Sequence, residues 1–424
     1  MIPVEQHTYD NGFRVLTTVQ HETKAVTALF LVGTGSRFET PELNGISHFL
    51  EHILFKGTKK YPSPLLLSEA LDGIGANFNA YTSQEYTGFY IQAESTHFSL
   101  ITDVLHEMFY LPRYAPEDIE REKGVIVEEI NMYHDLPQRH VGDVLFELMF
   151  QKATPMGRNI AGTKETVTQF TKQTFEDYQA QFYTPDNIIV SVAGNPEGSK
   201  WTHTLKDLLG SKRGKRARGF EAVVSTQQAP QVLIEKRPTD QTHLMLGIPM
   251  LKETDERMPI LTVLNTILGG SMSSRLFSEI REQRGLAYYV RSGEETFHDT
   301  GLLGVATGVR NDQAKEALKL ILIELKKFRD EQVTPAELTK AKEHFRGKMA
   351  LGLEGSSEIS SYVAQQQLYH GRTIQPEELV ERVSAVTAEQ VQALAQEFFL
   401  TEKLNLAAVG PFSNTDFQPI LEQW

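Results

Sequence analysis

The feature that most restricts the fold of this chain is a repeat of landmarks on either side of its midpoint. An amphipathic helix, a proline turn and a charged helix follow one another in both halves, and Pro116 and Pro335 are 219 residues apart. A strand that ends in glycine also occurs twice, with Gly194 and Gly410 separated by 216 residues. Proline is common at the first position of helices, so coincidence is the alternative explanation. The nearly equal spacing favours two copies of one unit of about 200 residues.

Strands come first in each copy. Residues 13–19 and 25–33 have the alternating or continuous apolar character of strands, and residues 243–250 have it at the corresponding place in the second copy. Helices and strands then alternate without a βαβ rhythm or a phosphate-binding loop. This order predicts an α+β fold with two homologous halves, each a mainly antiparallel sheet with helices packed on one side.

A basic run marks the boundary between the two copies. Five cations from Lys212 to Arg218 are interleaved with glycine, without an aromatic residue among them that could stack on a base. The net charge of -13 also argues against a nucleic-acid partner. We interpret the run as a solvated linker, with a basic patch that binds nucleic acid or acidic lipid as the alternative. The predicted domains are 1–211 and 231–424, joined by a linker at 212–230.

Composition excludes several kinds of chemistry. The chain has no cysteine, so any metal ion must be held by His, Asp or Glu. No apolar run approaches the ~18 residues that a membrane-spanning helix requires, so no membrane partner is expected. Residues 1–15 show neither a secretory leader nor an amphipathic presequence, which leads us to expect a cytoplasmic protein.

The clearest chemical motif is the pentapeptide HFLEH at residues 48–52. One helical turn separates His48 from His52, so both imidazoles lie on one helix face beside Glu51, opposite an apolar face. Gly57 offers a stop for this helix. Two histidines in this spacing can chelate one zinc ion, and the adjacent carboxylate can accept a proton from water. A surface helix with two solvated histidines is the alternative.

A zinc site needs a third protein ligand. Residues 116–133 have helical periodicity, and Glu122 and Glu129 fall within the apolar stripe that faces the core. Buried carboxylates are costly unless they are paired or bind metal, so Glu129 is a ligand candidate. Glu122, two turns earlier, can orient a ligand histidine, whereas Glu128 points about 100° away and is expected to be solvated. Pairing of both buried glutamates with Arg or Lys is the alternative.

These motifs resemble a known family. HFLEH, followed 77 residues after His52 by Glu129, looks like the inverted zinc motif of the pitrilysin, insulin-degrading enzyme and mitochondrial processing peptidase family. The likeness covers nearly the whole chain. It implies that His48, His52 and Glu129 bind zinc, that Glu51 is the general base, and that Glu122 is the supporting acid behind a ligand. The second half has no HxxEH motif, so one zinc ion per chain is expected.

Two further matches concern the substrate. Residues 79–82 (NAYT) resemble the family's edge strand, which implies that Asn79 and Ala80 pair with the substrate backbone. Arg281 and Tyr288 resemble the Arg/Tyr pair that the C-terminal half of the family contributes to substrate binding. Without the likeness, Tyr288 would be interpreted as a core aromatic residue and Arg281 as part of a surface ion pair.

The resemblance implies a zinc endopeptidase that hydrolyses short or unfolded peptides inside a closed chamber. The two halves of one chain would form half of a clamshell. Because the chain carries both the zinc motif and the Arg/Tyr pair, we expect a homodimer in which Arg281 and Tyr288 serve the partner's zinc site. A heterodimer with an inactive paralogue is the alternative. Alternative functions are a processing peptidase specific for one precursor, a non-catalytic subunit or scaffold, and a structural zinc or peptide-binding protein.

Overall fold

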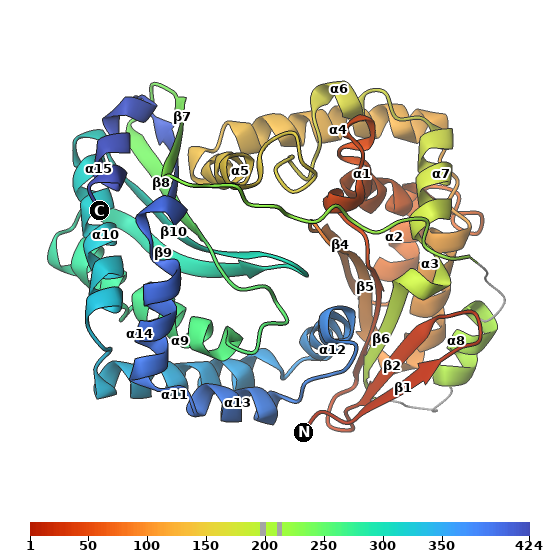
Figure 1. The fold of residues 1–424 in the computed structure, drawn as a ribbon. Coiled ribbons are helices and arrows are strands. Elements are labelled where there is room, and N and C mark those ends of the chain that lie inside the picture. The colour runs from red at the N-terminus through yellow and green to blue at the C-terminus, as the bar shows by residue number, and fades with distance from the viewer. Residues whose placement is uncertain (196–200, 210–213) are drawn as a thin grey trace. The chain divides into compact units, whose positions relative to one another are not determined.

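The computed structural model describes residues 1–195, 201–209 and 214–424 (Figure 1). The chain forms two compact units, each assembled from three separate stretches of sequence and each built around a sheet. Unit 1 comprises Met1–Asn131, Asn159–Glu221 and Leu351–Gln375. Unit 2 comprises Met132–Arg158, Ala222–Ala350 and Pro376–Trp424.

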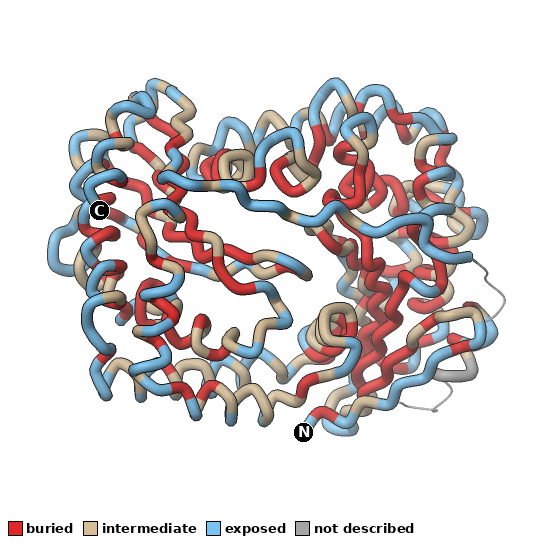
Figure 2. The backbone as a smooth tube through the Cα atoms, viewed as in Figure 1, coloured by how far each residue is buried: buried red, intermediate tan, exposed pale blue. Residues whose placement is uncertain are grey.

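Unit 1 contains a six-stranded sheet with the order β1-β2-β6-β3-β5-β4. Its strands are β1 (Val4–Thr8), β2 (Arg14–Val19), β3 (Ala25–Val32), β4 (Asn77–Thr82), β5 (Thr87–Glu94) and β6 (Ile188–Gly194). β2 and β6 are parallel, and the other neighbours are antiparallel. The central strands β3 and β6 are buried along almost their whole length, because both of their faces are largely apolar (Figure 2).

Helices cover both faces of this sheet. The helices of unit 1 are α1 (Ile46–Ile53), α2 (Pro64–Asp72), α3 (Phe98–Tyr110), α4 (Pro116–His134, which ends in unit 2), α6 (Lys164–Val167), α7 (Lys172–Phe182), α8 (Trp201–Leu209) and α12 (Ser356–His370). On one face, Phe30 of β3 joins the core that contains Leu105 of α3. On the other face, Leu31 joins a separate cluster with Val363 of α12. Alternate residues of a strand point to opposite faces, so β3 supplies both cores.

Unit 2 contains a five-stranded sheet with the order β7-β11-β8-β10-β9. Its strands are β7 (Gln231–Lys236), β8 (Gln241–Pro249), β9 (Ala287–Thr296), β10 (Gly301–Arg310) and β11 (Asn405–Gly410). β7 and β11 are parallel, and the other neighbours are antiparallel. The same order and directions occur in β2-β6-β3-β5-β4 of unit 1, which confirms the two homologous halves.

Helices also cover both faces of the second sheet. The helices of unit 2 are α5 (Pro137–Phe150), α9 (Met258–Leu268), α10 (Ala314–Asp330), α11 (Pro335–Gly352), α13 (Pro376–Ser384), α14 (Ala388–Phe398) and α15 (Gln418–Glu422). α9, α10 and α14 share one core with the strands, and α5 covers the opposite face, where Leu145 clusters with Val409. Gly247 of β8 allows this close approach, because a Cβ atom there would lie 2.6 Å from Sδ of Met149.

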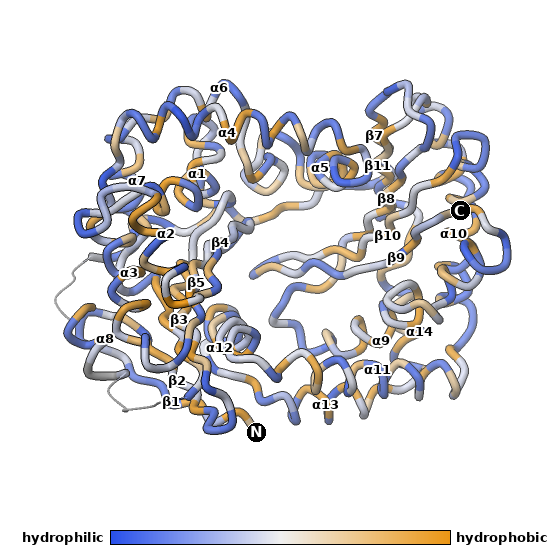
Figure 3. The backbone as a smooth tube through the Cα atoms, turned by 180° about the vertical axis from the view of Figure 1, so that it is seen from behind, coloured by the Kyte–Doolittle hydropathy of each residue, from blue (hydrophilic) through white to orange (hydrophobic). Residues whose placement is uncertain are grey.

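The predicted α+β fold is confirmed, with one difference in the placement of helices. The sequence predicted helices on one side of each sheet, whereas α12 and α5 also cover the second face. Both faces of the central strands are apolar and must be shielded from water, as their hydropathy shows (Figure 3). α5 comes from the first half of the sequence and packs in unit 2, and α12 comes from the second half and packs in unit 1. The domain limits at 211 and 231 stay a prediction.

Two observations bear on the expected linker and membrane properties. Residues 214–230 form no helix or strand. Arg218 donates a hydrogen bond of 2.7 Å to the carbonyl of Phe38, and the guanidinium of Arg216 lies 5.7 Å from the ring of Phe38, so these cations are held against unit 1. Lys212 and Arg213 lie outside the described residues. Among the helices that the structure describes, none combines the length and the apolar character needed to cross a membrane.

Candidate metal centre

Helix α1 carries the HFLEH motif and begins at a position that only glycine suits. Gly45 precedes the helix with φ +96°, and a Cβ atom there would lie 2.6 Å from the carbonyl oxygen of Ala161. The carboxylate of Glu39 accepts hydrogen bonds from the backbone N–H groups of Gly45 (2.8 Å) and Ser47 (2.9 Å). These bonds satisfy helix N-terminal amides that otherwise lack a partner. Burial raises the pKa of Glu39.

The two faces of α1 differ sharply in their surroundings. The side chains on the apolar face, which are 0–2% exposed, are Ile46, Phe49, Leu50 and Ile53. Packing of this face fixes the rotation of the helix and turns His48, Glu51 and His52 toward α4 and β4. α1 ends at Ile53, and after one 3₁₀ turn the chain leaves at Gly57 with φ +132°. The predicted helix and its stop are therefore confirmed.

Helix α4 supplies two carboxylates from one face. Glu122 and Glu129 are seven residues apart, which is close to two helical turns. Ile119 and Ile126 on the same side are buried in the core of unit 1, whereas Glu128 is exposed. The helical stripe and the solvated Glu128 predicted from the sequence are both observed.

Three possible metal ligands converge between α1 and α4. Oε2 of Glu129 lies 3.6 Å from Nε2 of His48 and 3.3 Å from Nε2 of His52, and one ligand atom from each residue lies within 4.8 Å of the others. A tetrahedral zinc ion with bonds of ~2.0–2.1 Å separates its ligand atoms by about 3.3–3.4 Å. Two imidazole nitrogens and one carboxylate are a common zinc donor set that leaves one position open. The residues therefore fit zinc in both spacing and chemistry.

Glu122 fixes the ring of His52 through Nδ1, whereas Nε2 of the same ring faces Glu129. Nδ1 of His52 lies 2.8 Å from Oε1 of Glu122, and Nζ of Lys56 lies 2.9 Å from Oε2 of the same carboxylate. Burial acts to raise the pKa of Glu122, but the bonds with His52 and Lys56 outweigh burial and lower it, so the carboxylate stays ionised. Burial acts to lower the pKa of His52, but hydrogen bonds with Glu122 and Glu129 raise it to about 9 in the metal-free site. A bound metal must displace that proton.

Glu51 is oriented by a neighbouring strand. Its Oε2 accepts a hydrogen bond of 2.7 Å from the hydroxyl of Thr82, the last residue of β4. Burial, and then the negative charge of Glu51, raise the pKa of Tyr183, so this phenol stays neutral near the site. The geometry places a fixed carboxylate beside the three possible ligands, as general acid–base chemistry requires.

Comparison with known proteins identifies the family. Residues 14–164 match the model of insulinase (peptidase family M16), and residues 169–345 match that of the peptidase M16 inactive domain. The uncharacterized zinc protease YmxG of Bacillus subtilis is 36% identical over 412 residues, which are 97% of this chain and 99% of YmxG. The chain belongs to peptidase family M16. An uncharacterized zinc protease of Streptomyces coelicolor is 35% identical over 421 residues, which are 97% of this chain and 90% of that protein.

Two solved structures share the M16 fold of this chain. A protease from Helicobacter pylori aligns with a TM-score of 0.88 and 20% identity, over 97% of this chain and all of the other. The peptidase M16 inactive domain from Pseudomonas fluorescens aligns with a TM-score of 0.89 and 18% identity, over 97% of this chain and 98% of the other. At these identities the likeness concerns the fold.

The predicted substrate strand of this M16 chain is an edge strand. β4 is the last strand in its sheet and pairs with β5 along residues 77–82. The backbone N–H of Ala80 donates to Oδ1 of Asn79 at 2.9 Å, a local bond that covers a main-chain donor. Asn79 is exposed and Ala80 is buried. The strand ends at Thr82, which bonds Glu51, so the edge leads directly to the candidate metal centre.

The second predicted substrate group lies in unit 2. Arg281 belongs to a π-helical segment, η6 (Phe277–Gln283), and Tyr288 follows at the start of β9. The guanidinium of Arg281 lies 4.8 Å from the ring of Phe277 and 5.1 Å from that of Tyr288. Tyr288 is 82% exposed, so it is no core aromatic residue. π-Helical turns occur frequently at functional sites.

Several contributors to the M16 site were not predicted from the sequence. Lys56 pairs with Glu122, and its position four residues after His52 was a usable signal. The alternative interpretation was that both buried glutamates pair with Arg or Lys. For Glu122 such a pair is observed, with Lys56. The sequence places Thr82 at the end of the edge strand but does not predict the bond from its hydroxyl to Glu51. Glu39, which caps α1 from a separate segment, left no signal in the local pattern.

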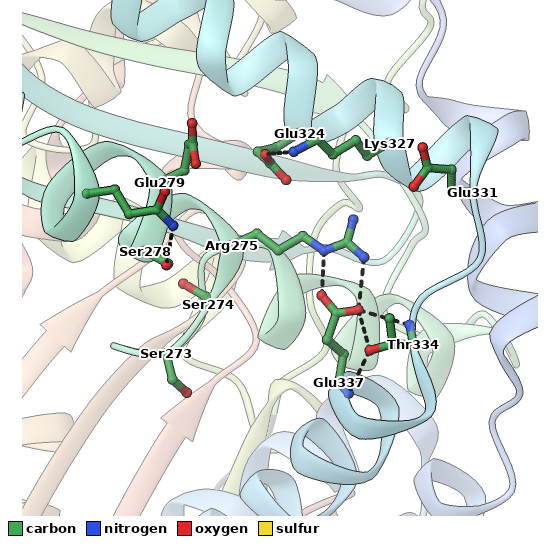
Figure 4. A pocket seen from close by; sticks show the side chains of 11 residues that line it. Ser273, Ser274, Arg275, Ser278, Glu279, Glu324, Lys327, Glu331, Thr334 and Glu337 are labelled. Carbon is green, nitrogen blue, oxygen red and sulfur yellow. Dashed lines mark hydrogen bonds and ion pairs between the residues drawn. The ribbon is translucent and has the colours of Figure 1, made fainter.

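A polar cavity of about 460 Å³ lies elsewhere, in unit 2, and contains none of the predicted site residues (Figure 4). Arg275 forms a bidentate ion pair with Glu337 in the lining of this cavity, with hydrogen bonds of 2.7 and 3.0 Å. The hydrogen bond from Arg275 is the main cause that lowers the pKa of Glu337 to about 2. Thr334 adds backbone and hydroxyl donors to the same carboxylate at 2.9 Å. Arg275, Thr334 and Glu337 of the lining are thus paired with one another.

Proposed function

We propose that this M16 chain is a zinc-dependent endopeptidase that hydrolyses short or unfolded peptides. The observation that carries the proposal is the convergence of His48, His52 and Glu129 at the ligand spacing of zinc, beside an oriented Glu51. Membership in a peptidase family and relatives named zinc proteases support it.

The chain's own side chains would divide the hydrolytic work. Bound zinc supplies Lewis-acid polarisation of the scissile carbonyl and acidifies a water molecule. Glu51, held at Oε2 by Thr82, takes the proton of the attacking water and delivers it to the leaving amine. Glu122 fixes the ring of His52 by its bond to Nδ1, which keeps Nε2 directed at the metal position.

Substrate backbone would extend the sheet of unit 1 at β4. An extended peptide that adds a strand to an exposed edge gains main-chain hydrogen bonds with little demand on its sequence. The Ala80 N–H is available to such a peptide once the Asn79 side chain moves aside. Because β4 ends at the Thr82–Glu51 bond, a strand bound there would carry its scissile carbonyl toward the metal.

Arg281 and Tyr288 would complete the site from a second chain. The exposed Tyr288 hydroxyl would donate to the developing oxyanion, and Arg281 would position the carbonyl or an acidic group. We propose a homodimer with two composite sites that enclose the substrate in a chamber. Pairing with an inactive paralogue is the outcome to be distinguished by experiment.

The test is digestion of a peptide library by the wild type and by Glu51→Gln, with and without a chelator, alongside metal analysis. Glu51→Gln should keep zinc and peptide binding but lose hydrolysis by several orders of magnitude. Glu128→Gln, which removes an exposed carboxylate from α4, should leave activity unchanged. Cleavage that resists both the Glu51 substitution and the chelator would overturn the assignment.

The same experiment separates the rival functions. A non-catalytic subunit, a scaffold or a structural zinc protein predicts no hydrolysis by the wild type under any condition. A processing peptidase predicts cleavage of one precursor and little of the library. The retained HFLEH motif and Glu129, with their ligand atoms brought together, favour the hydrolytic reading.

A further inference from the structure

A second group of metal-binding side chains lies in unit 2, at the corner where α4 leads into α5 (Figure 1). His134 is the last residue of α4, His140 lies in the first turn of α5, and Glu235 belongs to β7. One ligand atom from each residue lies within 4.8 Å of the others. The donor set, two imidazoles and one carboxylate, is the same as in the candidate metal centre of unit 1.

Both histidines direct Nε2 at the carboxylate of Glu235. Nε2 of His140 lies 2.5 Å from Oε2, and Nε2 of His134 lies 3.5 Å from Oε1. The two rings are 4.9 Å apart between centroids. The ligand atoms lie within 4.8 Å of one another, so binding zinc, which separates its ligands by about 3.3–3.4 Å, would require the side chains to adjust.

Each ring also has a carboxylate on its other nitrogen. Nδ1 of His140 lies 3.5 Å from Oδ2 of Asp143, and Nδ1 of His134 lies 3.3 Å from Oδ1 of Asp135. Metal-ligating histidines commonly donate their second N–H to a carboxylate, which fixes the tautomer and strengthens the ligand. The same arrangement holds His52 against Glu122 in unit 1.

Charge at the corner favours a dication. The carboxylates of Glu235, Asp143 and Asp135 lie at this corner with Arg237, which donates to Oε1 of Glu235 and to the carbonyl oxygen of His134, both at 2.5 Å. Arg237 thereby fixes Glu235 and the end of α4, while Oε2 of Glu235 faces His140. With neutral histidines these groups carry a net charge of -2, which a divalent ion would neutralise.

We infer that His134, His140 and Glu235 bind a second divalent transition-metal ion, with zinc as the best match. Imidazole nitrogens select zinc, cobalt and nickel over magnesium and calcium, which prefer all-oxygen sites. The ion ties the α4–α5 corner to β7 and stabilises unit 2. This inference is independent of the proposed function, because it concerns binding at residues that take no part in the proposed hydrolysis.

Zinc stoichiometry of the full-length chain is the primary test. Chelator-stripped protein is titrated with zinc, and bound metal is measured after gel filtration. The wild type should bind two ions per chain, and one should remain both in the double variant His48→Ala/His52→Ala and in His140→Ala. His21→Gln, which removes an exposed histidine of unit 1, should still bind two. A stoichiometry in His140→Ala that equals the wild-type value, or a His48→Ala/His52→Ala variant that binds no zinc, would overturn the inference.

Cobalt provides a spectroscopic readout within the His48→Ala/His52→Ala background. Cobalt(II) bound at the corner should give a visible d–d spectrum that disappears on adding His140→Ala. Asp143→Asn should weaken metal affinity by about 10- to 100-fold without abolishing binding. Zinc should raise the melting temperature of the double variant, and this rise should vanish with His140→Ala. An absent cobalt spectrum would show that the group is only an ion-pair cluster.

A second ligand variant, at an exposed position, distinguishes loss of the metal site from misfolding of His140→Ala. His134 is 54% exposed, so His134→Ala removes a ligand with little loss of packing. Its metal-free melting temperature should match that of the metal-free wild type, while its zinc content falls to one per chain. If His134→Ala retains two zinc ions, the three-ligand site is wrong.

Discussion

At the scale of single residues, the site depends on side chains that act through hydrogen bonds rather than through contact with the metal. Thr82 is the clearest case, because its hydroxyl donates to Oε2 of Glu51 from a different element. A hydrogen bond to a charged acceptor is short and directional, so it fixes the orientation of the carboxylate. The position of Glu51 is therefore set by β4 as well as by α1.

Replacing Thr82 by Val should lower kcat/KM about 10- to 100-fold, the rate equivalent of a lost hydrogen bond to a charged group. Zinc content should stay unchanged, because Thr82 touches none of the three ligands in the geometry described. Steady-state kinetics with one peptide substrate and metal analysis give both quantities. Thr82→Ser keeps the hydroxyl and should retain most of the activity. A loss of zinc in Thr82→Val would contradict this role.

At the scale of elements, the start of α1 determines where the two histidines point. Gly45 has φ +96°, which disfavours any side chain, and the carbonyl of Ala161 occupies the space of a Cβ atom. The helix cannot shift to relieve the clash, because its apolar face is buried. The backbone conformation at Gly45 and the packing of the apolar face therefore both fix the position of α1.

Gly45→Ala should destabilise the chain by at least about 1–2 kcal/mol, since backbone strain and a close contact add. Gly124, in the middle of α4, has nothing within 4 Å of a Cβ position. Gly124→Ala should therefore stabilise by up to about 1 kcal/mol through helix propensity. Urea unfolding of both variants measures the difference. If Gly45→Ala and Gly124→Ala change the free energy of unfolding by the same amount in the same direction, this prediction is wrong.

The start of α11 combines a cap with an ion pair. Glu337 accepts from the backbone and hydroxyl of Thr334 and from Arg275, and its pKa is lowered to about 2. A depressed folded-state pKa contributes stability above the ordinary value of 4.5. That contribution is lost as pH falls from about 4.5 toward 2.

Glu337→Gln should cost about 1–2 kcal/mol at pH 7, because solvent screens part of the pair. The difference from the wild type should shrink below about pH 4.5, where the wild-type carboxylate begins to lose its advantage. Urea midpoints measured from pH 7 to pH 3 test both statements. A penalty that grows on acidification would contradict the sign of the pKa shift.

At the scale of the whole molecule, the sequence predicted what depends on local spacing. Local spacing predicted the candidate metal centre, through the i, i+4 histidines and the two-turn spacing of Glu122 and Glu129. The repeated landmarks predicted two copies of one α+β unit. The placement of α5 and α12 was not predictable, because an amphipathic helix does not reveal which sheet it covers. The His134–His140–Glu235 group was also missed, since Glu235 lies 95 residues from His140 in sequence.

A homodimer with composite sites makes a quantitative prediction. Glu51→Gln and Tyr288→Phe should each be nearly inactive alone. Mixing them after dissociation and reassembly should restore about a quarter of wild-type activity, because half of the dimers are mixed and each has one intact site. Peptide cleavage measured before and after mixing provides the test. No recovery, with exchange verified by differential tagging, would mean that Tyr288 does not serve the zinc site of another chain.

The most direct test of the central claim is zinc-edge anomalous diffraction from crystals of the zinc-loaded full-length chain. Zinc bound as proposed should give an anomalous peak at ~2.0–2.2 Å from Nε2 of His48, Nε2 of His52 and Oε2 of Glu129. A zinc-loaded crystal with no peak between these three side chains would contradict it.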